Sequence, residues 1–214
     1  MIPPRPAILI GAGGHARVVA SLARACGLML HGVCDPALSA GGTADWEGMP
    51  VLGDDTALSA YPPGSFVLLN GLGHMPRKTH RQMVAQRLGA LGYDFPALVH
   101  PVAWVAPGTS LGAGVQVMAG AVVQPGCRIG AGSIINTRAS VDHDGWIGAD
   151  VHIAPGATLC GGVTVGDGAF VGAGATVVQG VEIACGAIVA AGAVVMQAVA
   201  AGETCFGRGQ KRNM

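Results

Sequence analysis

Charged side chains are scarce in this sequence: Asp, Glu, Lys and Arg make up 11% of its 214 residues, against roughly 25% in an average soluble domain. The 12 cationic and 12 acidic residues cancel, so the formal net charge is zero. A chain without excess positive charge has no electrostatic basis for binding a polyanion, and we expect no nucleic-acid partner. Because solvent-facing surfaces normally carry Lys and Glu, the scarcity of charge also predicts that another subunit covers much of the surface.

The sequence also lacks a CxxC pair, a signal sequence at its start and an apolar run long enough to cross a membrane. Its six cysteines do not have the spacing of a zinc ribbon, which favours a reduced protein. The mean hydropathy is high, at +0.50. However, the longest apolar stretch, residues 183–196, is shorter than the roughly 20 residues that a spanning helix needs. We therefore expect a cytoplasmic protein with no membrane partner and a large buried core.

What the sequence does have is a period of six residues between positions 99 and 200. An aliphatic residue recurs at every sixth position from Val99 to Val195, and the residue four places after each is usually small or Val. Six fits neither the 3.6-residue period of a helix nor the alternation of a long strand, so each hexad must be a short strand plus a corner. Three hexads make one triangular coil of eighteen residues. The pattern predicts a parallel β-helix with an aliphatic interior.

The residues before this repeat predict a small α/β domain with a phosphate-binding turn. Residues 7–10 form a short buried strand, followed by the turn Gly11-Ala12-Gly13-Gly14-His15-Ala16 and an amphipathic helix. The turn matches G-x-G-x-x-[GA], in which backbone N–H groups and a helix N-terminus face a phosphate. A second strand ends at Asp35, where such folds place the acid that binds a ribose.

Three regions follow from these patterns. We expect a Rossmann-like nucleotide-binding domain over residues 1–96, a β-helix domain over 97–202 and a C-terminal tail over 203–214. The first region has room for one mononucleotide-binding half but not for the two halves of a full dinucleotide domain, which counts against a dehydrogenase. Within it, residues 36–63 are expected to form a loop over the nucleotide and residues 77–91 a helix.

His143 is the strongest candidate for a catalytic side chain in the predicted β-helix. The inward positions of its hexad leave His143 facing outward, between the carboxylates of Asp142 and Asp144. A histidine oriented by a carboxylate can act as a general base. One coil later, Gly161 should stack over His143, leaving room for a substrate and a backbone N–H for an oxyanion.

Two segments resemble the bacterial sugar acyltransferases of the NeuD/PglD type. One is Asn-Thr-Arg-Ala-Ser-Val-Asp-His-Asp at 136–144, followed by His152, and the other is the turn at 11–15. Members of this family use acetyl-CoA and include sialic acid O-acetyltransferases and N-acetyltransferases of nucleotide-linked 4-amino sugars. The resemblance implies a left-handed β-helix, a homotrimer and no metal. It implies an N-acetyltransferase of a UDP- or GDP-4-amino sugar in surface polysaccharide biosynthesis, acting by direct transfer in a ternary complex.

The resemblance, together with the stacking of coils, also assigns roles to individual residues. His143 corresponds to the family's catalytic base, and Asp144 to the acid that orients it. The residues expected to bind acetyl-CoA are His152, Gly161, Ala173 and Ala191. The residues expected to bind the nucleotide sugar are Gly11, Gly13, Gly14, His15, Asp35, Asn70 and Asn136.

Three other functions remain open from the sequence. A sugar O-acetyltransferase would use the same residues. A β-helical zinc enzyme would need three converging histidines, and His100, His143 and His152 share no evident column. A non-enzymatic scaffold would leave the cluster of histidine and aspartate unexplained. Cys160 is the plausible nucleophile near His143, but a buried or inert cysteine is much the commoner case.

Overall fold

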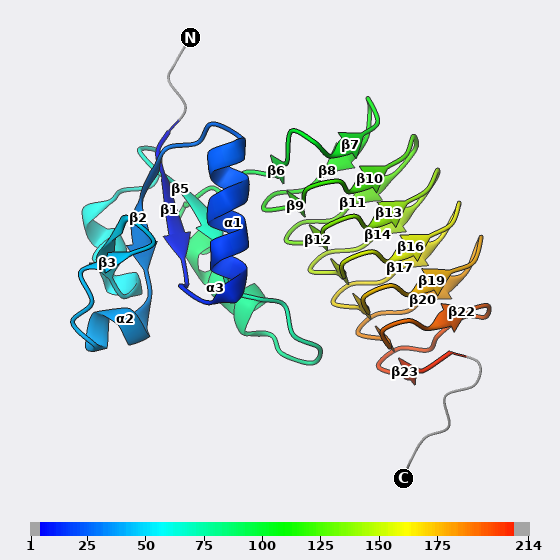
Figure 1. The fold of residues 1–214 in the computed structure, drawn as a ribbon. Coiled ribbons are helices and arrows are strands. Elements are labelled where there is room, and N and C mark those ends of the chain that lie inside the picture. The colour runs from blue at the N-terminus through cyan, green and yellow to red at the C-terminus, as the bar shows by residue number, and fades with distance from the viewer. Residues whose placement is uncertain (1–4, 208–214) are drawn as a thin grey trace. The chain divides into compact units, whose positions relative to one another are not determined.

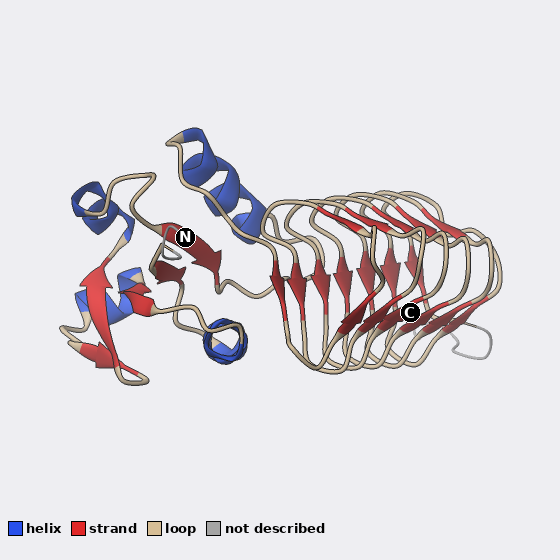
Figure 2. Ribbon diagram, turned by 90° about the horizontal axis from the view of Figure 1, so that it is seen from above, coloured by secondary structure: helices blue, strands red, loops and turns tan. Residues whose placement is uncertain are grey.

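The computed structural model describes residues 5–207, which form two compact units divided between Leu98 and Val99. The N-terminal unit is an α/β domain, and the C-terminal unit is a triangular β-helix, here called the prism (Figures 1 and 2). This is the predicted fold class. Among the described helices, none is long and apolar enough to cross a membrane.

The sheet of the N-terminal unit has the strand order β3-β4-β2-β1-β5. Its strands are β1 (Ala7–Ile10), β2 (Leu30–Cys34), β3 (Asp45–Trp46), β4 (Met49–Gly53) and β5 (Val67–Asn70). All neighbours pair in parallel except β3 and β4. The Gly-rich turn, Asp35 and the segment after Asn70 follow β1, β2 and β5, so they meet at the same edge of the sheet, where open α/β sheets bind ligands.

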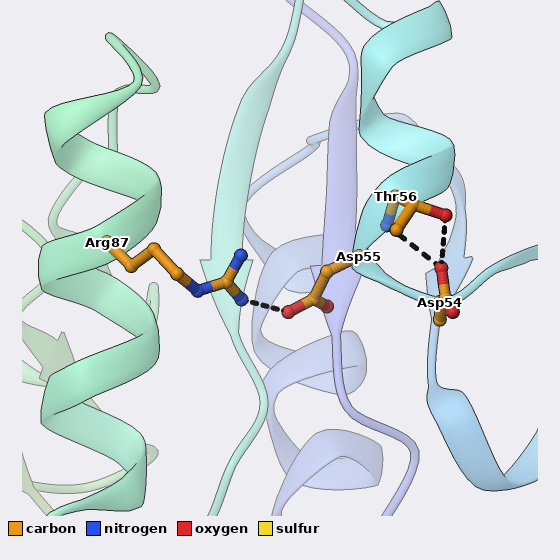
Figure 3. Close-up of polar contacts among 4 residues, drawn as sticks. All are labelled: Asp54, Asp55, Thr56 and Arg87. Atoms are coloured by element: carbon orange, nitrogen blue, oxygen red, sulfur yellow. Dashed lines mark hydrogen bonds and ion pairs between the residues drawn. The ribbon is translucent and has the colours of Figure 1, made fainter.

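The segment 36–63 is folded, and the expectation of a loop there was wrong. It contains α2 (Pro36–Ala40), β3, β4 and the 3₁₀ helix η1 (Asp55–Ala60). Pairing of β4 with β2 extends the sheet, while Asp54 accepts hydrogen bonds from the backbone and hydroxyl of Thr56 at 2.9 and 2.6 Å. Arg87 in turn pairs with Asp55 at the start of η1 (Figure 3). Sequence periodicity does not reveal these elements, because they are short and are separated by Gly and Pro.

The two longer helices are α1 (Gly14–Ala25) and α3 (His80–Ala90). The second begins three residues later than the sequence predicts. Arg77 has a left-handed backbone with φ of 61°, which interrupts a right-handed helix. Buried residues at Arg81, Val84 and Leu88 define the inner face of α3.

The prism has three sides, each a parallel sheet of two-residue strands (Figure 2). The first side contains β7 (Trp104–Val105), β10 (Val122–Val123), β13 (Ser140–Val141), β16 (Thr158–Leu159), β19 (Thr176–Val177) and β22 (Val194–Val195). The second contains β8 (Ser110–Leu111), β11 (Arg128–Ile129), β14 (Trp146–Ile147), β17 (Thr164–Val165) and β20 (Glu182–Ile183). The third contains β6 (Leu98–Val99), β9 (Gln116–Val117), β12 (Ile134–Ile135), β15 (His152–Ile153), β18 (Phe170–Val171), β21 (Ile188–Val189) and β23 (Thr204–Cys205).

The eighteen-residue stacking predicted from the repeat is confirmed by the strand register. Val141 pairs with Val123 on one side and Leu159 on the other, and the aliphatic residue of each described hexad points into the core. We call the turn from the first to the second side the first corner, the next the second corner, and the turn from the third side back to the first the third corner.

The strands continue past residue 202, where the β-helix domain was expected to end. Thr204 and Cys205 form β23, which pairs with Ile188 and Val189 of β21. A break in the six-residue period after Val195 conceals this last strand. Most of the expected tail, residues 208–214, lies outside the described residues.

Candidate active site

The first corner carries His143 in the turn between β13 and β14. Its Nδ1 lies 2.9 Å from Asp144 Oδ2, and its backbone N–H donates to Asp142 Oδ1 at 2.7 Å. An ionised carboxylate can only accept, so Nδ1 carries the proton and Nε2 is left with a free lone pair. The hydrogen bond to Asp144, followed by the charges of Asp142 and Asp144, raises the pKa of His143 above its ordinary value. This arrangement supplies an exposed, oriented base.

Gly161 lies directly over the imidazole, as the stacking of coils predicts. A Cβ added to Gly161 would come 2.5 Å from His143 Nε2, so no other residue fits there without moving the ring. The neighbouring amides are used, since Cys160 donates to Val177 and Gly162 donates to the carbonyl of His143. Gly161 N–H donates to no backbone carbonyl among residues 5–207. It is the amide of this turn that is available to a developing oxyanion.

A backbone irregularity marks the coil that contains His143. The third residue of every turn between positions 108 and 192 has a left-handed conformation, and it is Gly in all of these turns except three in succession. Those three residues are Arg138, Asp144 and Asp150, with φ of 58°, 58° and 51°. A residue with a side chain pays about 1 kcal/mol or more for this conformation. Such outliers cluster at functional sites, and Asp144 has an evident reason to be one.

The third corner brings together Asn136 and His152. Asn136 Nδ2 donates to His152 Nε2 at 3.0 Å, while Asn136 Oδ1 accepts from Thr137 N–H at 2.7 Å. The buried His152 ring packs edge-on against Phe170 at 5.0 Å between ring centroids. Asn136 was expected to bind the nucleotide sugar, yet its amide contacts the histidine expected beside the thioester.

Ala173 and Ala191 stack at the same third corner, in the turns after β18 and β21. Gly192 N–H donates to the carbonyl of Ala173 at 2.8 Å, and both alanines are exposed. Their side chains are small, so no long side chain at these two positions covers this edge of the prism.

One chain does not bring His143 and His152 together. A whole side of the prism separates the first corner from the third, on the order of 15–20 Å for the seven residues from Asn136 to His143. A general base must lie within about 3 Å of the proton that it removes. Within a single copy the two histidines therefore cannot act on the same pair of reacting atoms.

At the sheet edge of the N-terminal unit, the Gly-rich turn is held open by specific contacts. Gly11 has φ of 88°, and a Cβ there would lie 2.7 Å from Leu72. Gly13 caps α1 without a side-chain hydrogen bond, and the first turn of the helix begins at Gly14 on this edge of the sheet. Asp35 accepts from Ala12 N–H at 2.9 Å and also caps α2. Its carboxylate thus shapes the turn.

The side chain of Asn70 is used within the fold. Its Nδ2 donates to the carbonyl of Arg81 at 3.1 Å, and its Oδ1 accepts from Leu72 N–H at 3.1 Å. The buried guanidinium of Arg81 donates back to the carbonyls of Asn70 and Leu72. Burial, followed by the charges of Arg81 and His15, lowers the pKa of His74 to about 4. Sequence reasoning missed Arg81, although a charged residue in line with Val84 and Leu88 on an inner helix face is a usable signal.

The cysteines of the prism differ in environment. Cys127 is buried, and its thiol donates to the carbonyl of Asp142 at 3.0 Å; burial raises its pKa. Cys160 is half-buried and lines a cavity of about 230 Å³ with Gln124, Ser140 and Thr158. Within residues 5–207 no group of three or more His, Cys, Asp or Glu is placed to hold a metal ion.

Comparison with family models divides the chain in the same way as its structure. The PglD N-terminal domain matches residues 7–87. The bacterial transferase hexapeptide model matches residues 108–143 and 144–179, and the hexapeptide repeat of succinyl-transferase matches 162–197. A comparison with curated protein sequences gives no match.

Several solved structures are similar to nearly the whole chain. The acetyltransferase domain of PglB from Neisseria gonorrhoeae, in complex with acetyl coenzyme A, is 37% identical over 94% of this chain and 95% of that one, with a TM-score of 0.87. PerB from Caulobacter crescentus, in complex with CoA and GDP-perosamine, is 38% identical over 91% and 90%, with a TM-score of 0.81. WeeI from Acinetobacter baumannii is 25% identical over 94% and 96%, with a TM-score of 0.83.

Proposed function

Because this chain belongs to the hexapeptide-repeat sugar acetyltransferases that carry a PglD N-terminal domain, we propose that it acetylates the amine of a nucleotide-linked amino sugar with acetyl-CoA. The observation that carries the proposal is the pair of His143 and Asp144, 2.9 Å apart, with Nε2 free beneath Gly161. Two similar structures support the substrates, since one contains acetyl coenzyme A and the other CoA with GDP-perosamine.

The proposed reaction is a direct transfer. The amine of the sugar attacks the thioester carbonyl, and His143 Nε2 takes the proton that the nitrogen loses. Asp144 holds the imidazole in the useful tautomer and stabilises its protonated form. The oxyanion of the tetrahedral intermediate accepts a hydrogen bond from Gly161 N–H, and the thiolate of coenzyme A leaves and is then protonated. Within this scheme Cys160 has no covalent role.

The two substrates occupy different parts of the chain in this proposal. Acetyl-CoA lies along the third corner, with its thioester beside Asn136 and His152 and its arm over Ala173 and Ala191. The nucleotide lies at the Gly-rich turn, where Gly13, Gly14 and His15 begin α1 beside its phosphates and Asp35 accepts from a ribose hydroxyl. Gly11 acts through its turn conformation, because its own N–H donates to the carbonyl of Cys34. Asn70 acts indirectly, by fixing the segment after β5.

We further propose a cytoplasmic homotrimer in which the first corner of one protomer meets the third corner of the next. A contact between two different surfaces closes into a ring when the rotation is right, and three triangular prisms can close in this way. The outward residues of the described first-side strands are uncharged, and Trp104 and Val194 are about half exposed in the single chain. Their burial between subunits would account for the low charge of the sequence.

The test is an assay with matched acceptors. UDP- and GDP-linked 4-amino sugars and their 4-hydroxy counterparts are incubated with acetyl-CoA, and products are identified by mass spectrometry and NMR. We expect an amide product from one nucleotide-linked amino sugar. An ester product from the hydroxy sugar at an equal or higher rate would replace N-acetylation by O-acetylation, and no product from any acceptor would contradict the proposal.

A further inference from the structure

Arg138 has a backbone that its side chain does not favour. It is the third residue of the turn Asn136-Thr137-Arg138 and has φ of 58°, at a position where the turns before and after it on the third corner have Gly120 and Gly156. Its stem passes over Gly120, with Cγ 3.4 Å from the place of a Cβ on that residue. Asp144, in the next turn, has the same irregularity and orients the base. A residue kept against its backbone preference in the catalytic coil points to a use for its side chain.

The fold does not use the charge of Arg138. Between residues 99 and 207 the prism has two cations, Arg128 and Arg138. It has six carboxylates there, on Asp142, Asp144, Asp150, Asp167, Glu182 and Glu203. Arg138 is exposed, and its guanidinium makes no ion pair or side-chain hydrogen bond with any residue in the described range 5–207. Both proposed substrates carry phosphates, which an anionic prism would repel unless a cation were placed to receive them.

The position of Arg138 on the third corner decides whether it can reach the phosphates of coenzyme A or the diphosphate of the acceptor. The pantetheine arm separates the thioester from the phosphates of coenzyme A by about four extended residues, or roughly 14 Å. Coils stack about 4.8 Å apart, so an arm that runs over Ala173 and Ala191 ends about three coils beyond His152. Arg138 lies two residues from Asn136, at the thioester end of that arm. The diphosphate of the acceptor is one pyranose ring from the reacting amine, a span that an extended Arg side chain can match.

We propose that Arg138 binds the diphosphate of the nucleotide-linked acceptor and so selects a nucleotide sugar over a free sugar. This inference rests on the proposed function. The planar guanidinium donates two hydrogen bonds to one phosphate group, which fixes the sugar relative to the thioester.

The experiment uses the full-length protein with Arg138→Gly and Arg138→Lys, and Arg128→Gln as a charge-matched control on β11 of the second side. Calorimetry measures the Kd of UDP, GDP, uridine and guanosine, and kinetics measures KM for the amino-sugar acceptor and for acetyl-CoA. For Arg138→Gly we expect the Kd of the preferred nucleoside diphosphate and the acceptor KM to rise about 10- to 100-fold. The Kd of the nucleoside and the KM of acetyl-CoA should stay within about twofold, and Arg138→Lys should recover part of the loss.

Thermal unfolding distinguishes binding from a structural role. Gly fits the left-handed turn better than Arg, so the Tm of Arg138→Gly should equal or exceed that of the wild type. A lower Tm with unchanged Kd values would overturn the inference, as would a rise in the KM of acetyl-CoA alone or an equal loss in Arg128→Gln. If the wild-type protein acetylates the acceptor while Arg138→Gly retains its Kd and KM, this inference fails and the proposed function stands. A wild-type protein that binds neither UDP nor GDP would contradict both.

Discussion

The coil from Asn136 to Ile153 and the coils stacked on either side of it share one backbone but differ at their corners. Elsewhere between positions 108 and 192 the left-handed turn residue is Gly, whereas this coil has Arg138, Asp144 and Asp150. The inward residues do not change, and the strand register is continuous across all of these coils. The repeat therefore fixes geometry, and two of the three positions where one coil departs from it, Arg138 and Asp144, have roles in the proposed chemistry.

The left-handed backbone at these three non-glycine positions is tolerated because the rest of the coil is held firmly in place. Each strand of the central coils is held by two parallel neighbours and by a filled aliphatic core. These contacts keep the corner residue in its left-handed conformation, although that conformation costs about 1 kcal/mol. A turn in an isolated loop would relax. This contrast can be tested by substitutions that act on the departing corners or on the shared interior.

The largest effect is expected from His143→Ala. Loss of the general base should lower kcat by about 10²- to 10⁴-fold. The KM of acetyl-CoA should change little, because the proposed acetyl-CoA residues lie at a different corner. Steady-state kinetics with the best amino-sugar acceptor measures both quantities. A near-normal kcat in this variant would show that His143 is not the general base, and the coil 136–153 would then have no catalytic difference from the others.

A smaller loss is expected from Gly161→Ala. The added methyl group would overlap the imidazole, because the Cβ position is 2.5 Å from His143 Nε2. Displacement of a catalytic group by about 1 Å can cost up to 100-fold, so we expect kcat to fall about 10- to 100-fold with an unchanged Tm. The same turn position one coil later holds Gln179, so the backbone accepts a side chain there.

Gln179→Ala is the control for Gly161→Ala. It changes the same turn position without contact to His143 and should leave kcat within about twofold. If Gly161→Ala keeps full activity, catalysis does not require the space that Gly161 leaves over the imidazole of His143.

Next in size is Asp144→Asn, with about a tenfold loss in kcat and a shift in pH dependence. Asp144 raises the pKa of His143. The acid limb of kcat/KM should therefore lie above the ordinary histidine value of about 6.5 in the wild type. Removing the carboxylate lowers that pKa, so the base stays unprotonated at more acidic pH and the limb moves to lower pH. The titration of the acceptor amine is the same for both enzymes, and a limb that does not move would contradict the role of Asp144.

The smallest effect on catalysis is expected from Ser133→Ala, inside the prism. Its buried hydroxyl donates to the carbonyl of Gly148 at 2.8 Å and accepts from Val151 N–H at 2.9 Å. Leaving these two groups without a partner should cost about 1–3 kcal/mol of unfolding free energy. The value of kcat should stay within about twofold, because Ser133 belongs to the interior that all coils share. Denaturant unfolding and kinetics on the same preparation would check both outcomes.

The sequence predicted those parts of the fold that depend on regular spacing. The six-residue period identified the inward residues, and the eighteen-residue coil placed Gly161 over His143. Prediction failed where short elements are defined by contacts between distant residues. The pairing of β4 with β2 and the ion pair of Arg87 with Asp55 join segments far apart in the chain, so local pattern could not identify residues 36–63 as folded.

In the candidate site, too, local contacts were predictable from the sequence and contacts between distant residues were not. His143 and Asp144 are adjacent in sequence, so their contact follows from the turn alone. The contact of Asn136 with His152 crosses sixteen residues, and only the stacking of two coils creates it. The use of Asn70 to hold Arg81 depends on how α3 packs, which hydrophobic pattern does not specify.

The central claim is that the reaction takes place where the first corner of one protomer meets the third corner of another. Mixing tests it most directly: His143→Ala and His152→Ala, each expected to have little activity alone, are unfolded and refolded together at equal amounts, with each variant refolded alone as the control. In a closed ring of randomly assembled protomers, about a quarter of the sites would combine an intact His143 with an intact His152 from the neighbour. We predict that activity returns to about that fraction of the wild-type value. No recovery in a mixture whose co-assembly is verified by mass spectrometry would place both histidines at a site within one chain and contradict the account.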